Sequence, residues 1–473
     1  MAKVNVPAPS IKTHEGGTAK RINPELQLRR SVMACLLWED SFYESGEDIA
    51  SRIMQTIPKV APATVAAIAI EAREQMKLRH VPLLIVREMA RHKEHKALVA
   101  DTLSRVIQRA DELSEFLAIY WKEKKQPLSA QVKKGLAAAF TKFSAYDLAK
   151  YNRDGTVKLR DVLFLCHAKP KDETQAAMWK RLIAGTLESP DTWEVELSAG
   201  KDKKETWTRL MAEKKLGALA FLRNLRNMQG VDVDRKAMKD YFTTMKVDRV
   251  LPYRFIAAAR FAPDLEPELE TSMFKAIEGA DKIKGRTVLL IDVSGSMDSP
   301  ISNKSDLKRF DAACGLAILA RELCEDVRVF TFSEWLCEVP PRRGFALRDA
   351  IVQSQPHGGT WVGAAVNILH KGNAEGITGN SPNQMGFQRN HPLFCRVSNP
   401  KTDYHGGPVS YDRLIVITDE QAHDSIPDPK GKGYVINVAA YQNGVGYGAW
   451  NHIDSWSEAV LTYIQRSEHE VID

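Results

Sequence analysis

Apolar residues follow two different periods along the chain, and the change falls near residues 279–285. Before it, apolar positions recur every three or four residues, which is the spacing of amphipathic helices. The clearest segments are Pro24–Trp38, Ala63–Lys77, Pro82–Arg91, Val132–Phe143, Thr174–Gly185 and Leu216–Met228. Short turns rich in Pro, Gly, Asp and Lys separate them, so we expect antiparallel helices stacked in HEAT-type pairs, although no repeat has a fixed period.

After the change, short apolar runs alternate with helical segments. The expected strands are Thr287–Val293, Val327–Ser333, Arg413–Thr418 and Tyr434–Ala440, and the expected helices are Leu307–Glu325, Thr360–Lys371 and Trp456–Arg466. This alternation predicts a doubly wound sheet whose ligand sites lie at the carboxyl ends of the strands. The fold class is therefore α + α/β, with a helical unit over residues 1–284 and an α/β unit over residues 285–473.

Oxygen-bearing side chains gather where the predicted strands end. Asp292 ends an apolar strand, and Ser294 and Ser296 follow it at alternate positions. Thr360 begins a predicted helix after two glycines, and Asp419 ends another apolar strand. A buried carboxylate needs a partner, and oxygen ligands suit Mg²⁺ or another divalent cation. The alternative is three ordinary loops rich in helix-capping residues.

The order D-x-S-x-S, Gly-Gly-Thr, Thr-Asp resembles the metal-ion-dependent adhesion site (MIDAS) of von Willebrand factor A domains. We expect Ser294 and Ser296 as direct ligands, Thr360 as a direct or water-bridged one, and both aspartates as holders of bound water. One coordination position stays open, and an acidic group of a protein partner can complete it. The segment Gly372–Pro408, rich in Asn, Gly and Pro, is an expected surface loop near this site.

Positive charge is concentrated in one region of the helical half. The chain has a formal charge of +6, but residues 121–180 alone hold 13 Lys and Arg against 6 Asp and Glu, a balance of +7. Such a region attracts polyanions, and RNA is the expected one because phosphate neutralisation releases counterions. The alternative is an ordinary solvated helical surface.

Within that region, a predicted helical hairpin spanning Lys150 to Pro170 carries Lys150, Arg153, Lys158, Arg160 and His167. Lysine and arginine bind phosphates, and histidine stacks on unpaired bases, so these five residues are the first candidate RNA contacts. The alternative for the histidine is a structural role at a helix C-terminus.

A second candidate RNA surface is the predicted helix Leu216–Met228. Leu219, Leu222 and Leu225 form one apolar row, which leaves Arg223 and Arg226 on another face. These guanidiniums either contact RNA or form salt bridges between helices.

Four segments in this order resemble the Ro autoantigen family, whose helical part is the TROVE module: His14–Thr18, Lys150–Pro170, Leu222–Met228 and Leu251–Phe255, followed by an A domain. The resemblance implies a ring of HEAT-like repeats with a von Willebrand A-type domain packed against it. It also implies that a basic outer surface binds small Y RNAs and that the central hole takes single-stranded 3′ ends of misfolded or decaying RNA.

In that family, a Lys and a His on the outer surface contact RNA, and they fall on Lys150 and His167. A basic residue between them aligns with Asp154, so Arg153 is a shifted substitute. Bacterial members work with an exoribonuclease through a tethering RNA, and this chain fits a bacterial or a phage member.

Other classes of protein fit the sequence less well. Six scattered cysteines without C-x-x-C spacing, no apolar signal segment and no run of ~18 apolar residues predict a reduced cytoplasmic protein with no membrane span. No phosphate-binding G-x-x-x-x-G-K-[ST] loop occurs, so we do not expect an enzyme. The remaining alternative is a protein-only adaptor, in which the helical repeats and the metal site both bind proteins.

Overall fold

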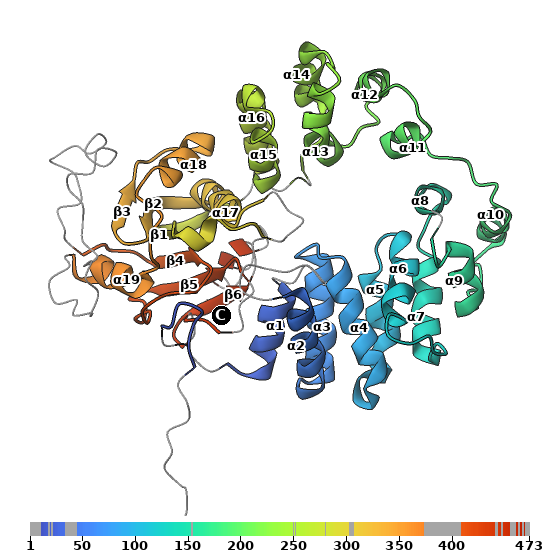
Figure 1. Cartoon of the computed structure of the whole chain (residues 1–473), viewed down its shortest axis with the longest axis horizontal. Helices are drawn as coiled ribbons and strands as arrows, with labels where there is room; N and C mark the ends of the chain where they lie inside the picture. The colour runs from blue at the N-terminus through green and yellow to red at the C-terminus, as the bar shows by residue number, and fades with distance from the viewer. Residues whose placement is uncertain are drawn as a thin grey trace, which may run out of the picture.

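A computed structural model describes residues 11–17, 19, 22–33, 45–152, 155–248, 250, 252–279, 281–301, 307–372, 408–439, 443–445, 448–454, 460–461, 464–465 and 468. Helices succeed one another along an arc, and a sheet unit lies where the two ends of the arc meet (Figure 1). Among the described helices, none combines the length and apolar character that crossing a bilayer requires.

The first part of the arc contains α1 (Pro24–Met33), α2 (Gly46–Thr56), α3 (Pro62–Glu74), α4 (His80–Arg91), α5 (Val99–Val106), α6 (Asp111–Tyr120), α7 (Ala130–Phe140), α8 (Ala145–Tyr151), α9 (Leu159–Cys166) and α10 (Glu173–Ala184). Side chains cap several of them, as Ser129 does by accepting a hydrogen bond from the Val132 backbone N–H. Their apolar faces form one continuous core, which confirms the helical period of the sequence.

The second part of the arc contains α11 (Trp193–Ser198), α12 (Lys203–Ala212), α13 (Ala218–Gln229), α14 (Arg235–Thr244), α15 (Pro252–Ala259) and α16 (Glu266–Ala276). These helices do not share the first core. Their buried residues belong to a core that continues into the sheet unit. The last helices and the sheet are therefore stabilised together.

Among the described residues, six strands form one sheet in the order β3-β2-β1-β4-β5-β6. They are β1 (Ile283–Asp292), β2 (Cys324–Phe332), β3 (Leu336–Val339), β4 (Arg413–Thr418), β5 (Lys432–Asn437) and β6 (Asn451–Asp454), and all neighbouring pairs are parallel except β2 with β3. The predicted doubly wound α/β unit is confirmed.

Both faces of this sheet are buried. Leu289 and Ile291 of β1 pack into the core shared with α17 (Arg309–Leu323) and α18 (Gly344–Val352), whereas Val288 and Leu290 pack on the other side with α19 (Val362–Lys371). Burial on both faces explains the uninterrupted apolar runs in the sequence. From β1 the chain adds β2 and β3 on one side of the sheet, and then β4, β5 and β6 on the other. In doubly wound sheets, ligands bind at the carboxyl ends of the two strands where this reversal occurs, here β1 and β4.

One sequence expectation needs correction, and three others fall largely or wholly outside the described residues. Leu219 is 42% exposed, so the core row of α13 runs instead through Phe221, Leu222, Leu225 and Met228. Most of the segment Gly372–Pro408 lies outside the described residues, as do most of the expected helix Trp456–Arg466 and the cysteines Cys35 and Cys395. The described cysteines, Cys166, Cys314, Cys324 and Cys337, are buried free thiols.

Candidate metal centre and RNA-binding surfaces

Hydrogen bonds join the three loops that carry the predicted metal ligands. The Gly295 N–H donates to the Gly358 carbonyl at 3.1 Å, which ties the Asp292 loop to the Thr360 loop. The His423 N–H donates to the Thr360 carbonyl at 2.9 Å, which ties that loop to the segment after Asp419. The structure therefore brings the loops of Asp292, Ser294, Ser296, Thr360 and Asp419 together at one edge of the sheet.

Asp292 lies fully buried at the end of β1. Its carboxylate accepts hydrogen bonds from the Ser294 backbone N–H at 2.8 Å and from the Thr418 hydroxyl at 2.6 Å. Burial, and then the nearby Asp419 carboxylate, raise the pKa of Asp292 to about 7. Two buried carboxyl groups this close repel each other when both are ionised, and a bound cation relieves that repulsion.

The remaining donors match a hard cation. The Ser294 and Ser296 hydroxyl oxygens lie 3.2 Å apart. Adjacent oxygens of an octahedral Mg²⁺ site are about 3 Å apart when each lies 2.0–2.1 Å from the ion. Thr360, also buried, adds a third hydroxyl to these two and to the two carboxylates. All of these candidate ligand atoms are oxygens, so the set suits Mg²⁺ better than a soft metal ion that prefers thiolate ligands.

Arg309, at the start of α17, is a feature of this centre that the sequence did not reveal. Its side chain is buried, and its Nη1 donates to Asp419 Oδ2 at 3.2 Å. The same nitrogen lies 3.4 Å from the Ser296 carbonyl oxygen. The guanidinium balances one of the two carboxylates, so the centre keeps one negative charge for a metal when both are ionised.

Next to the metal loops lies a second buried polar cluster, formed by Arg30, Glu420, His452 and Asp454. Arg30 of α1 donates to Glu420, which directly follows Asp419. His452 Nε2 lies 3.2 Å from Glu420 Oε2 and 3.0 Å from Asp454 Oδ1. We call these four residues the clasp, because they join the first helix to the far edge of the sheet.

The clasp contains a set of residues that is able to hold a metal ion. The ligand atoms of Glu420, His452 and Asp454 all lie within 4.8 Å of one another. The Arg30 guanidinium already supplies positive charge to two of them, with Nη1 3.9 Å from Asp454 Oδ1. Burial raises the pKa of Asp454, as expected for a carboxyl group removed from water.

Thr418 connects the clasp to the metal loops. Its hydroxyl donates to Asp292 Oδ2 and accepts from the Glu420 backbone N–H at 3.0 Å. Glu420 adopts a left-handed backbone conformation with φ of 58°, which is uncommon outside glycine. Two adjacent carboxylates thus point to different centres, Asp419 to the metal loops and Glu420 to the clasp.

The N-terminal segment covers the same loop from outside. The Thr13 hydroxyl donates to the Ala422 carbonyl at 2.9 Å, and the His14 N–H donates to Gln421 Oε1 at 2.7 Å. A Cβ added at Gly17 would overlap the Ala422 carbonyl oxygen, so only glycine fits there. The His-Glu-Gly-Gly motif near the start therefore has a structural role at the contact with the sheet unit.

The basic hairpin, residues 145–184, contains the first set of predicted RNA contacts. The Lys150 ammonium lies 5.9 Å from the Tyr146 ring centre and 5.7 Å from the Tyr151 ring centre. Lys158 precedes α9, Arg160 is exposed in its first turn, and the exposed His167 ends it with φ of 53°. Arg153 lies outside the described residues.

The second predicted RNA surface lies on α13. Arg223 and Arg226 are both exposed, on the side opposite the buried Leu222 and Leu225. The Arg226 guanidinium lies 5.4 Å from the ring centre of Phe261, an aromatic side chain that is itself 39% exposed. An exposed guanidinium beside an exposed ring is a pair able to bind a nucleotide phosphate and its base.

Comparisons with known proteins agree with this architecture. Residues 175–284 match the model of the TROVE domain. Telomerase protein component 1 of Mus musculus is 24% identical over 252 residues, and the match covers 50% of this chain but only 9% of that protein. The crystal structure of the Ro (RSR) protein of Deinococcus radiodurans has the same fold, with a TM-score of 0.56 and 18% identity over 94% of this chain and 100% of that one.

The fold of the Ro protein accounts for both parts of this chain, the helical arc and the doubly wound sheet. The matched TROVE region runs from α10 to the beginning of β1, so it contains α11 to α16, the part of the arc whose core continues into the sheet. By these comparisons the chain contains a region similar to the TROVE domain and has the fold of a Ro protein.

Proposed function

We propose that this chain is an RNA-binding scaffold. The observation that carries the proposal is the basic hairpin, where Arg160, Lys169, Lys171 and Lys180 are all exposed close to His167. Residues 158–181 hold six Lys and Arg against three Asp and Glu. Clustered cations on one surface bind polyanions because each neutralised phosphate releases a counterion.

The proposed ligands are a small structured RNA of the Y type on the basic hairpin, and single-stranded 3′ ends of misfolded or decaying RNA near Arg223 and Arg226. A structured RNA presents closely spaced phosphates to a basic surface, whereas an unpaired end offers bases for stacking. We assign RNA binding to a unit of residues 1–284 and the metal centre to a unit of residues 285–473.

The proposed setting is cytoplasmic RNA quality control or degradation, with an exoribonuclease held through a tethering RNA. We assign no catalytic residues to the chain itself.

We propose that the candidate metal centre binds Mg²⁺ or another divalent cation. The residues that would hold the ion are Asp292, Ser294, Ser296, Thr360 and Asp419. A bound ion supplies an open coordination position that an acidic group of a partner protein can fill. The chain's own residues hold the surrounding loops in place, chiefly through Thr418 and Arg309.

The proposal is tested by the salt dependence of binding to a fluorescent RNA hairpin. We expect affinity to fall at least about tenfold between about 50 and 200 mM salt, because several phosphates are neutralised. Purified protein should also carry RNA that raises its 260/280 nm absorbance ratio until RNase or a high-salt wash removes it. Binding that does not change with salt, with no copurified RNA, would favour the protein-only adaptor.

A further inference from the structure

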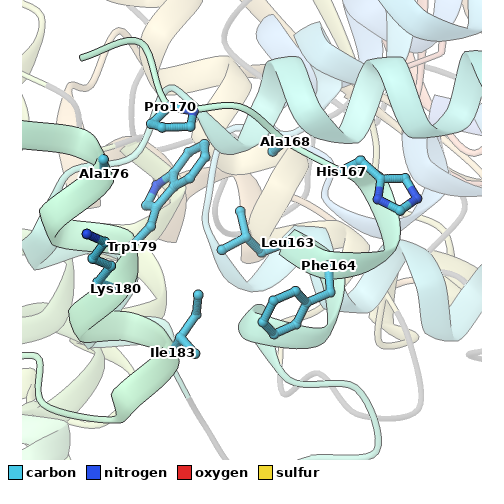
Figure 2. Close-up of a pocket in the computed structure, with 9 residues that line it drawn as sticks. All are labelled: Leu163, Phe164, His167, Ala168, Pro170, Ala176, Trp179, Lys180 and Ile183. Atoms are coloured by element: carbon cyan, nitrogen blue, oxygen red, sulfur yellow. The ribbon is translucent and has the colours of Figure 1, made fainter. Parts of the chain in front are cut away.

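Helices α9 and α10 of the basic hairpin leave an open apolar groove between them. Leu163 and Phe164 of α9 face Trp179 and Ile183 of α10 across it, and His167 and Lys180 lie at its two sides (Figure 2). The groove has a volume of about 420 Å³, which lies in the range of small-ligand sites.

The groove has a fixed floor and an exposed wall. Leu163 and Trp179 are buried, and the Trp179 ring packs edge-on against Phe140 with ring centres 5.4 Å apart. Phe164, in contrast, is 58% exposed, and Ile183 is 36% exposed. An exposed aromatic ring on a preformed apolar wall is typical of a binding surface, because a bound partner gains free energy by removing the ring from water.

The surroundings of the groove select the partner by charge. Exposed Arg160, Lys169, Lys171 and Lys180 belong to the same hairpin. Two of the acidic groups there have structural tasks, since Asp161 accepts from the Lys158 backbone N–H at 2.9 Å and Asp172 accepts from the Gln175 N–H at 2.7 Å. An apolar site among cations suits a ligand that is flat and apolar in one part and anionic in the next, which describes a nucleotide of RNA.

We propose that the groove receives one unpaired nucleobase of the RNA bound to the basic hairpin, stacked on Phe164. This inference rests on the proposed RNA-binding function. Bases inside an A-form stem are already stacked, so only a bulged or looped-out base is able to enter. The lining side chains with charge or hydrogen-bonding capacity are His167, Lys180 and the indole N–H of the buried Trp179, and the rest are apolar, so we expect stacking to dominate and little preference among the four bases.

The test uses a series of otherwise identical RNA hairpins, each with a single 2-aminopurine bulge moved one base pair at a time through one helical turn, and one hairpin without a bulge. At one or more bulge positions, we expect tighter binding than to the fully paired hairpin and a change in 2-aminopurine fluorescence. Phe164→Ala should lower affinity for those bulged hairpins about 5- to 150-fold, the range for losing one stacked base. It should leave binding to the paired hairpin unchanged.

Two further variants separate stacking from other effects. Phe164→Tyr keeps an aromatic ring and should restore the bulge preference. Leu165→Ala is the matched control, because Leu165 is an exposed apolar residue of the same helix, 37% exposed, that does not line the groove. The melting temperature should be unchanged in all three, because these side chains are exposed.

Three outcomes would overturn the inference. If no bulge position improves binding, or if the improvement survives Phe164→Ala, the groove does not take a base, and a protein segment becomes the alternative occupant. Salt-dependent binding of the paired hairpin would in that case leave the proposed function intact. If the wild-type chain binds no hairpin at all, the proposed function and this inference fall together.

Discussion

Arg30 and Glu420 form a buried ion pair between the first described helix and the loop that follows β4, across 390 positions of sequence. Glu420 stands directly after Asp419, which faces the metal loops and pairs with Arg309. The contact that joins the start of the helical arc to the sheet is therefore one residue away from the candidate metal centre. A change at either centre is able to reach the other through Thr418.

Breaking this pair should destabilise the protein strongly. We expect Arg30→Ala to lower the free energy of unfolding by about 3–5 kcal/mol, because it leaves buried carboxylates without their partner. Denaturant unfolding measures the loss. The control is Arg105→Ala, which removes an exposed pair with Glu74 at 3.0 Å and should cost at most about 1 kcal/mol. Equal effects of the two substitutions would show that the clasp does not stabilise the fold.

RNA binding by the basic hairpin should depend on Lys150 and His167. The double variant Lys150→Ala with His167→Ala should weaken binding of a structured RNA at least about tenfold, which filter binding or anisotropy measures. Stability should change by less than about 0.5 kcal/mol, since neither side chain is buried. Lys59→Ala with Lys96→Ala removes two exposed charges from other elements and should leave affinity nearly unchanged. A large fall in melting temperature would instead assign His167 a structural role.

Metal binding should require the two serines of the Asp292 loop. Ser294→Ala with Ser296→Ala should abolish the Mg²⁺ signal in calorimetry, because two direct ligands are lost. Affinity for structured RNA should stay the same, because the basic hairpin belongs to a separate core. Ser299→Ala, on the same loop, is the matched control and should keep Mg²⁺ binding. Simultaneous loss of metal and RNA binding would contradict this independence.

The arginines of α13 should bind unpaired RNA ends. A duplex with a 3′ single-stranded extension should bind more tightly than the blunt duplex, and Arg223→Ala with Arg226→Ala should remove that advantage. The control variant is Arg235→Ala with Lys236→Ala, which removes two exposed cations from α14 and should keep the advantage of the 3′ extension. If the extension gives no advantage to the wild type, single-stranded ends are not bound; if the advantage survives in the α13 variant, the two arginines have another role.

Stability should fall with acid because of His370. Burial, with smaller contributions from Lys430 and Lys371, lowers the pKa of His370 to about 4 from 6.5, and its Nε2 lies 2.6 Å from the Tyr411 hydroxyl. The unfolded chain takes up this proton below pH 6.5 but the folded chain only near pH 4. Keeping His370 neutral in the fold therefore has no cost above pH 6.5, where the unfolded chain is neutral as well. As the pH falls from 6.5 toward 4, the free energy of unfolding drops by up to ~3 kcal/mol.

Denaturant unfolding between pH 4 and 7 measures this effect. His370→Gln should flatten the dependence, whereas His167→Ala, at an exposed histidine, should leave it as in the wild type. An unchanged slope in His370→Gln would assign the acid sensitivity to other groups.

The sequence by itself determined the two-part organisation and the loops of the metal centre. Apolar periods identified helices such as α3 and α10 and the four interior strands β1, β2, β4 and β5, because the period of buried positions follows directly from helix and strand geometry. Asp292 and Asp419 were predictable as neighbours, since the carboxyl ends of parallel strands share one edge. The candidate RNA contacts around Lys150 and Arg223 were chosen from their charge, their helical spacing and the order of the segments that resemble the family.

Only the tertiary structure decided which charges are paired and which apolar residues stay exposed. The spacing of Leu219 places it next to the core row, but the described elements leave it 42% exposed. Phe164 is exposed as well, since α10 leaves a groove beside it. Arg309 and the clasp residues carry no local signal, because their partners come from distant positions. Which residues form these ion pairs depends on how the helical arc packs against the sheet, and only the folded chain determines that.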